Sequence, residues 1–169
     1  MVDYGRFVNR TPAPSKQSLE KTCAAIESSL AEMKIIAGRF SSNDHNMAGA
    51  DKYRLLYLGS TIYDFYLLAE DCLLHIARTI DCWVPASLDW RARLIKLMRS
   101  PFPEKRPPVI STETALLLSE YLILFLNFHH QCTTLSPERV KKLLENLGPL
   151  CSQLEDELTA FTTLIKPKV

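Results

Sequence analysis

Two adjacent histidines, His129 and His130, stand at the end of a mostly apolar run that extends from Ala115 to Phe128. Because an imidazole titrates near neutral pH, these side chains can transfer protons, ligate a metal or bond the last carbonyls of a helix. Neighbouring residues on a helix point about 100° apart, and no partner one turn away completes a metal site. The residues alone leave three interpretations open: a helix-end pair, a proton-transfer centre and a metal site.

Other groups that could do chemistry are scattered. The carboxylates of Asp64, Glu70 and Asp71 could hold a divalent metal, but no Glu-x-x-His motif accompanies them, which favours a solvated or ion-paired face. The glycines are isolated, so no phosphate-binding glycine loop is present. The cysteines show no C-x-x-C spacing, and we expect reduced, mostly buried thiols and neither a metal nor a cofactor. These cysteines are Cys23, Cys72, Cys82, Cys132 and Cys151.

The length and charge of the chain limit its class. Its 169 residues suffice for one domain with a sizeable core, and a formal net charge of +1 provides no global field for nucleic acid or an anionic membrane. Residues 1–14 contain no apolar signal segment, and the apolar run is too short to span a bilayer. We expect a loose arm over residues 1–14 and a single helical-bundle domain over residues 15–169, in a cytoplasmic protein.

The elements that must position the histidines are almost all helices. Apolar residues recur every three or four positions over about 15–40 and 55–81, which predicts two long helices with one buried face each. Ser87 or Asp89 can cap a short third helix, and the apolar helix should run from Ser111 to near Cys132.

The last helix and the connecting loop carry clear local signals. Ser136 as N-cap and Pro137 at the first helical position open a helix whose apolar stripe continues to Ile165. Gly148-Pro149 predicts a kink within it. The four prolines of "RSPFPEKRPPVIS" exclude regular structure before the apolar helix. With no convincing strand pattern, the prediction is an all-α, up-and-down bundle of about five helices.

Several segments, in order and spacing, resemble the HepT-like branch of the HEPN superfamily. They are "YDFYLLAEDCLLHIARTID", "DWRARLIKLM", "RPPVIS" and "LSPERVKKLLENL", and the similarity covers about Gly59 to Leu164. The resemblance implies a HEPN-like helical bundle that dimerises and, in active members, an endoribonuclease toxin. It also implies a small nucleotidyltransferase antitoxin as the partner.

The family's chemistry lies in a pattern close to Phe-Arg-His-x-x-Arg-His-x-Tyr, a few residues before Leu-Asp-Pro-Glu-Arg. Aligned on Leu135–Arg139, the family's catalytic histidine falls on His129 and its catalytic arginine on Leu124. The second arginine falls on Phe128, and the tyrosine that such antitoxins modify falls on Gln131. The motif is therefore degenerate, since no arginine lies between Arg106 and Arg139.

The departure bears directly on the family's metal-independent cleavage. There the 2′-hydroxyl attacks the adjacent phosphate, histidine transfers a proton and arginine stabilises the growing charge. Losing one preorganised charge donor typically costs about 100- to 1,000-fold in rate. His129 and His130 remain the candidate catalytic residues, whereas Leu124 and Phe128 are predicted to fill an interface between subunits.

Two functional hypotheses follow. The first is a toxin–antitoxin component with little or no ribonuclease activity, which acts as a homodimeric binding protein for a nucleotidyltransferase. The second is a working endoribonuclease that combines His129 with a cation from Arg106, Lys141 or Lys142. The first has the better support; RNA binding is expected to be weak, and neither DNA nor a membrane is an expected partner.

Overall fold

The computed structural model describes residues 13–40, 51–130 and 135–166, except for the side chains of His129 and His130. The described residues form α1 (Lys16–Arg39), α2 (Lys52–Ile76), the π-helical segment η1 (Ala77–Asp81), α3 (Trp90–Arg99), α4 (Thr112–His130) and α5 (Pro137–Ile165). The only strand-like feature among them is an isolated bridge between Phe102 and Arg106. The prediction of an all-α bundle is confirmed.

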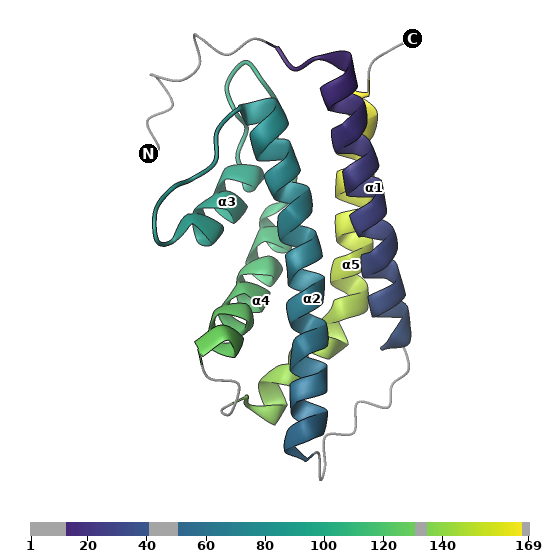
Figure 1. The fold of residues 1–169 in the computed structure, drawn as a ribbon, viewed down its shortest axis with the longest axis vertical. Helices are drawn as coiled ribbons and strands as arrows, with labels where there is room; N and C mark the ends of the chain where they lie inside the picture. Colours follow the sequence, from purple (N-terminus) through teal and green to yellow (C-terminus); the bar gives the residue numbers. More distant parts are fainter. Residues whose placement is uncertain (1–12, 41–50, 131–134, 167–169) are drawn as a thin grey trace.

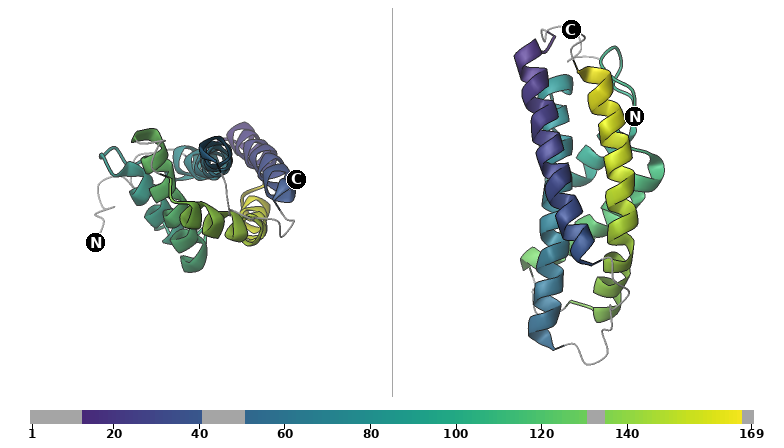
Figure 2. Two further views of the ribbon diagram at one scale, coloured as in Figure 1. Left: turned by 90° about the horizontal axis from the view of Figure 1, so that it is seen from below. Right: turned by 90° about the vertical axis from the view of Figure 1, so that its right-hand side faces the viewer.

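Helix α2 is the centre of the bundle. Figure 1 shows α1 and α5 on one side of it and α3 and α4 on the other, and α2 contacts all four of these helices. The view along the bundle in Figure 2 shows the same division end-on. Within the described residues, no helix is long and apolar enough to cross a membrane.

Side-chain caps fix where the helices begin. The side chains of Ser15, Asp51 and Ser136 accept hydrogen bonds from the backbone N–H groups three residues later, at 3.2, 2.8 and 3.4 Å. Ser111 Oγ accepts from Thr114 N–H at 3.1 Å at the start of α4. These contacts satisfy amide groups that have no partner within the helix. The predicted starts at Ser15, Ser111 and Ser136 are confirmed.

The second long helix ends near Asp81, as predicted, but its last turn is π-helical and not α-helical. Its last residues form η1, and Cys82 then adopts a left-handed conformation with φ 53°. The wider π-turn leaves Asp81 only 2% exposed, facing the proline-rich loop. The sequence predicts the end near Asp81 but gives no signal for the π-turn.

The last helix continues through its proline. Helix α5 contains Pro149, and Figure 1 shows its first turns running at an angle to the remainder. Since proline lacks an N–H donor and crowds the preceding turn, a bend at this place follows from the sequence. Along its length α5 contacts α1, α2 and α4.

A buried arginine holds the proline-rich loop between α3 and α4. Arg106 is 5% exposed, and its Nε and Nη2 donate to the two carboxylate oxygens of Asp81 at 2.7 and 2.8 Å. Its remaining N–H groups donate to the carbonyls of Ser100, Pro107 and Leu97 at 3.0, 3.1 and 3.3 Å. This loop has no regular structure, as predicted, yet it is fixed to the end of η1.

Candidate functional site

The histidines of the candidate site stand on the last turn of α4. The helical backbone extends to His130, so His129 and His130 are both helical residues. Their side chains, together with Gln131, lie outside the described residues. Their assignment as catalytic residues therefore stays a prediction. The structure does describe the preceding turns of α4 and the side chains that pack against them.

Leu124 belongs to the core of a single chain. It is 2% exposed and lies in the same hydrophobic cluster as the buried residues of α2, α3 and α5. A side chain that is already buried has almost no surface left to contribute to a second subunit. In the single chain α4 turns the Leu124 side chain inwards to the core. Its assignment to an interface between subunits stays a prediction, which this burial disfavours.

Phe128 lies at the edge of the core, one helical turn beyond Leu124. It is half-buried, and its ring centroid is 5.5 Å from that of Tyr63 on α2. Gly59 makes this approach feasible, because a Cβ at that position would lie 2.9 Å from the Phe128 ring and 2.7 Å from Leu135. Part of Phe128 remains accessible, so its assignment to an interface stays a prediction.

Aromatic side chains of α2 pack against the C-terminal half of α4. Phe125 stacks on Tyr63 with ring centroids 4.6 Å apart and an interplanar angle of 13°, and it meets Tyr66 at 5.0 Å. Phe125 is four residues before His129, so both occupy the same face of α4. Phe125, on the face of α4 that leads to the candidate histidine, is therefore packed on α2.

A buried polar cluster adjoins Phe125. Glu70 is 6% exposed; its Oε2 accepts a hydrogen bond from Tyr66 Oη at 3.0 Å and lies 2.8 Å from Arg91 Nε. Burial raises the pKa of the Glu70 carboxyl, against the opposing effect of the Arg91 guanidinium. Burial and the charge of Glu70 likewise raise the pKa of Tyr66. Glu70 is ion-paired with Arg91, which agrees with the expectation of a solvated or ion-paired face for these carboxylates.

Arg91 also brings a positive charge to α4. Its guanidinium carbon lies 4.3 Å from a ring of Trp90 and 4.7 Å from the ring of Phe125. It comes from α3, so it belongs to no motif on α4, and sequence reasoning missed it. The only signal was its place in "DWRARLIKLM", whose packing against α4 no spacing rule predicts.

The cations named for a non-standard nuclease centre are engaged elsewhere. Arg106 is committed to Asp81, and its five bonds to Asp81 and loop carbonyls leave no N–H for a substrate. Lys142 Nζ forms an ion pair with Glu120 at 3.0 Å, and Lys141 Nζ lies 3.8 Å from Glu145. The suggestion of Arg106 is corrected, because that side chain serves the loop.

The remaining carboxylates and histidines were candidates for a metal site. Within the part of the chain that the structure describes, no group of three or more histidine, cysteine, aspartate or glutamate side chains could hold a metal ion. Asp71 lies 3.5 Å from His75 on the same helix, and Asp64 is exposed. His45 lies outside the described residues.

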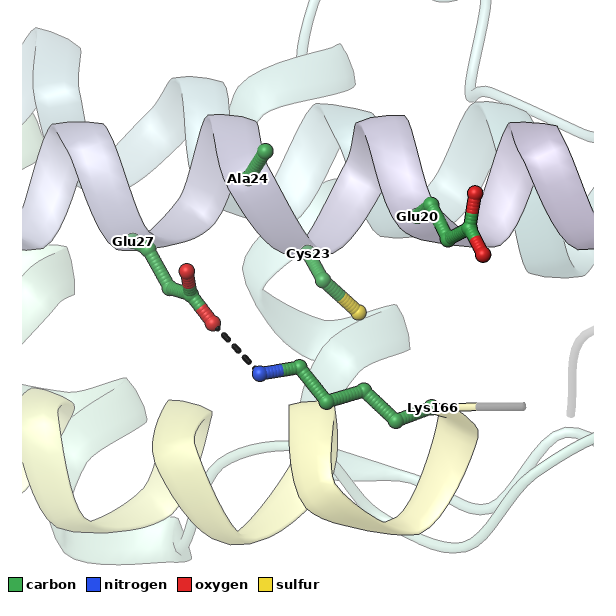
Figure 3. A pocket seen from close by; sticks show the side chains of 5 residues that line it. All are labelled: Glu20, Cys23, Ala24, Glu27 and Lys166. Atoms are coloured by element: carbon green, nitrogen blue, oxygen red, sulfur yellow. Dashed lines mark hydrogen bonds and ion pairs between the residues drawn. The ribbon is translucent and has the colours of Figure 1, made fainter. Parts of the chain in front are cut away.

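The thiols are placed for packing. Cys23 and Cys72 are 2% and 0% exposed, and burial raises the pKa of both thiols, that of Cys72 to about 12. Figure 3 shows Cys23 beside the ion pair of Glu27 and Lys166, which joins α1 to the end of α5 at 2.8 Å. A protonated thiol is a poor nucleophile, which disfavours Cys23 and Cys72 as nucleophiles. Cys151 is also buried, Cys82 is exposed, and Cys132 lies outside the described residues.

The comparison with protein families is decisive for the class of the chain. A family model described as HepT-like protein matches residues 57–165, which is more than half of the chain. The chain belongs to the HepT-like family. The match begins within α2 and ends with α5, so it covers every element around the candidate site of this HepT-like protein.

Two further comparisons gave no result. Neither the curated proteins nor the solved structures include a match to this HepT-like chain.

Tyr121 is the tyrosine nearest in sequence to Gln131 in this HepT-like protein, and it is sequestered. It is 0% exposed, and its hydroxyl donates to the backbone carbonyl of Leu143 on α5. Burial raises the pKa of the Tyr121 phenol, which keeps it protonated. In the folded chain this side chain has no accessible oxygen to receive a nucleotidyl group.

Proposed function

We propose that this chain is a toxin–antitoxin component of the HEPN superfamily whose ribonuclease centre is degenerate. It acts mainly as a homodimeric binding protein for a nucleotidyltransferase-type partner. The observation that carries the proposal is the burial of Leu124 at the position where the family pattern has its catalytic arginine. A leucine packed in the core carries no charge and cannot replace the arginine as a charge donor.

The loss is electrostatic. When the 2′-hydroxyl of RNA attacks the adjacent phosphate, negative charge grows on the phosphoryl oxygens and must be stabilised by a positioned donor. His129 can still transfer a proton, but proton transfer alone contributes about 100- to 10,000-fold. Without the arginine, the rate should fall by about 100- to 1,000-fold relative to an active relative.

A second candidate function, metal-independent endoribonuclease, rests on Arg91. Its guanidinium lies 4.7 Å from Phe125, one helical turn before His129. The adjacent Glu70 carboxylate, however, lies 2.8 Å from Arg91 Nε, so this guanidinium is already ion-paired. We therefore rank a working nuclease second.

Self-association is part of the proposal, without a contribution from Leu124. The half-buried Phe128 remains from the predicted interface, and it lies beside α2 at the end of α4. The proposed contact is thus at the histidine-bearing end of the bundle.

We expect the purified protein to cleave single-stranded RNA about 100- to 1,000-fold more slowly than an active HepT-like nuclease, and its expression alone to be tolerated. Release of labelled fragments from an RNA oligonucleotide measures the rate. His129→Ala is the control for any residual activity, and Arg91→Gln tests the second candidate. Robust cleavage that both replacements abolish would reject the degenerate centre and establish the nuclease.

Co-expression with a nucleotidyltransferase encoded beside the gene should give a complex that purifies through a tag on either protein. Residue 131 should remain unmodified, because glutamine lacks the phenolic oxygen of the family's tyrosine. Mass spectrometry of the intact chain and its peptides measures both outcomes. Transfer of AMP to Tyr121 would contradict its burial in the folded chain, and failure to co-purify would reject the partner.

A further inference from the structure

Helix α3 carries an excess of positive charge. Its ten residues include four cations, Arg91, Arg93, Lys96 and Arg99, and no carboxylate. The structure pairs Arg91 with Glu70 and Arg93 with Asp89, both at 2.8 Å. Lys96 and Arg99 have no carboxylate partner within the described residues. In a chain of net charge +1, this is a local concentration of uncompensated charge.

These two cations border a groove between α3 and α4. The groove has a volume of about 280 Å³. Its floor includes Ile95 and Ala115, which are buried, whereas Leu116 on α4 is 62% exposed. The groove is lined by Ala92, Ile95, Lys96, Arg99, Ala115, Leu116 and Ser119. No acidic side chain is among them.

The apolar surface continues beyond the groove. Ile123 is two helical turns after Leu116 on the same face of α4, and it is 47% exposed. Helix α3 packs against α4 (Figure 1), and Lys96 and Arg99 line the groove together with Leu116. A solvent-facing row of large apolar side chains bordered by unpaired cations is costly to leave in water and typical of an interaction surface.

We propose that this groove binds an acidic, amphipathic helical segment of a partner protein. Apolar side chains of the segment would cover Leu116 and Ile123, and its carboxylates would meet Lys96 and Arg99. The inference rests on the proposed binding function and names the chemistry of the partner's surface. Charge complementarity selects an acidic partner, and the apolar floor selects a peptide over a nucleic acid, since no aromatic side chain lines the groove for a base to stack on.

The test uses the full chain and a fluorescein-labelled 16-residue peptide with leucines on one helical face and glutamates elsewhere. Fluorescence anisotropy measures binding at low and moderate salt. The double replacement Lys96→Gln/Arg99→Gln should weaken binding about tenfold, as expected for the loss of two partly exposed charge contacts. Raising the salt concentration should weaken binding to the unmodified chain and have less effect on the variant.

A matched control removes the same two charges elsewhere. Lys52 and Arg54 are exposed at the start of α2, and Lys52→Gln/Arg54→Gln should leave peptide binding unchanged. Equal losses in both double variants would show nonspecific charge attraction and overturn the proposal. Circular dichroism of each variant confirms that its helices are intact.

Other occupants give different results. A 16-nucleotide uridine oligomer that binds more tightly than the peptide and depends on Lys96 and Arg99 would reassign the groove to nucleic acid. A dimer that dissociates in Lys96→Gln/Arg99→Gln during sedimentation would reassign it to a second copy of the chain. No peptide binding to the unmodified chain would reject the groove, even where a nucleotidyltransferase co-purifies. Peptide binding without co-purification would instead support the groove and reject the proposed partner.

Discussion

Replacing Arg106 by alanine should lower the free energy of unfolding by about 3 to 5 kcal/mol. The replacement leaves the Asp81 carboxylate, which is 2% exposed, without the charge that compensates its burial. It also removes the donors to the carbonyls of Leu97, Ser100 and Pro107. Urea denaturation followed by circular dichroism measures the change.

An exposed ion pair of the same residue types provides the matched control. Arg93 Nε donates to both carboxylate oxygens of Asp89 at 2.8 and 2.9 Å, but both side chains are more than half exposed. Arg93→Ala should therefore cost less than about 1 kcal/mol. If Arg93→Ala and Arg106→Ala lowered the free energy of unfolding equally, burial of the Arg106–Asp81 pair would make no difference to the cost of losing its arginine.

A double replacement separates the ion pair from the loop contacts. Asp81→Leu/Arg106→Met removes both charges and keeps apolar volume, so no uncompensated charge remains. It should cost less than Arg106→Ala alone. A double variant less stable than the single one would show that the carbonyl contacts, rather than the stranded carboxylate, dominate the loss.

The helices of this chain could be predicted because their signals are local. The caps at Ser15, Ser111 and Ser136 and the three-to-four-residue apolar spacing depend on neighbours within one or two turns. Such signals do not depend on how the helices are arranged in the tertiary structure. The π-turn before Cys82 was missed, since its wider turn has no equivalent pattern in the sequence.

The surroundings of the site were less predictable. A mostly apolar run on α4 indicates that some face is buried but does not show whether the same chain or a second chain covers it. Leu124 is covered by its own chain, whereas Leu116 and Ile123 are exposed. Arg91 reaches Phe125 from another helix, and only tertiary packing brings those residues together.

An arginine at position 124, where the resemblance places the family's catalytic arginine, should disrupt the fold instead of giving nuclease activity. Leu124→Arg forfeits about 1.5 to 3 kcal/mol of apolar burial and places an unpaired charge in the core, at a further cost of about 3 to 5 kcal/mol. The sum, about 4.5 to 8 kcal/mol, is comparable with the whole stability of many domains. We expect loss of helical signal in circular dichroism, or a large drop in the urea midpoint, and no gain in RNA cleavage.

Two controls locate the cause of that effect on α4. Leu116→Arg makes the same change on the exposed face of the helix, at a side chain that is 62% exposed, and should shift stability by no more than about 0.5 kcal/mol. Leu124→Met keeps apolar volume and should cost less than about 1.5 kcal/mol. A folded Leu124→Arg protein that cleaves RNA in a His129-dependent manner would contradict both expectations. It would mean that α4 can turn this position outwards, and that the missing arginine alone silences the centre.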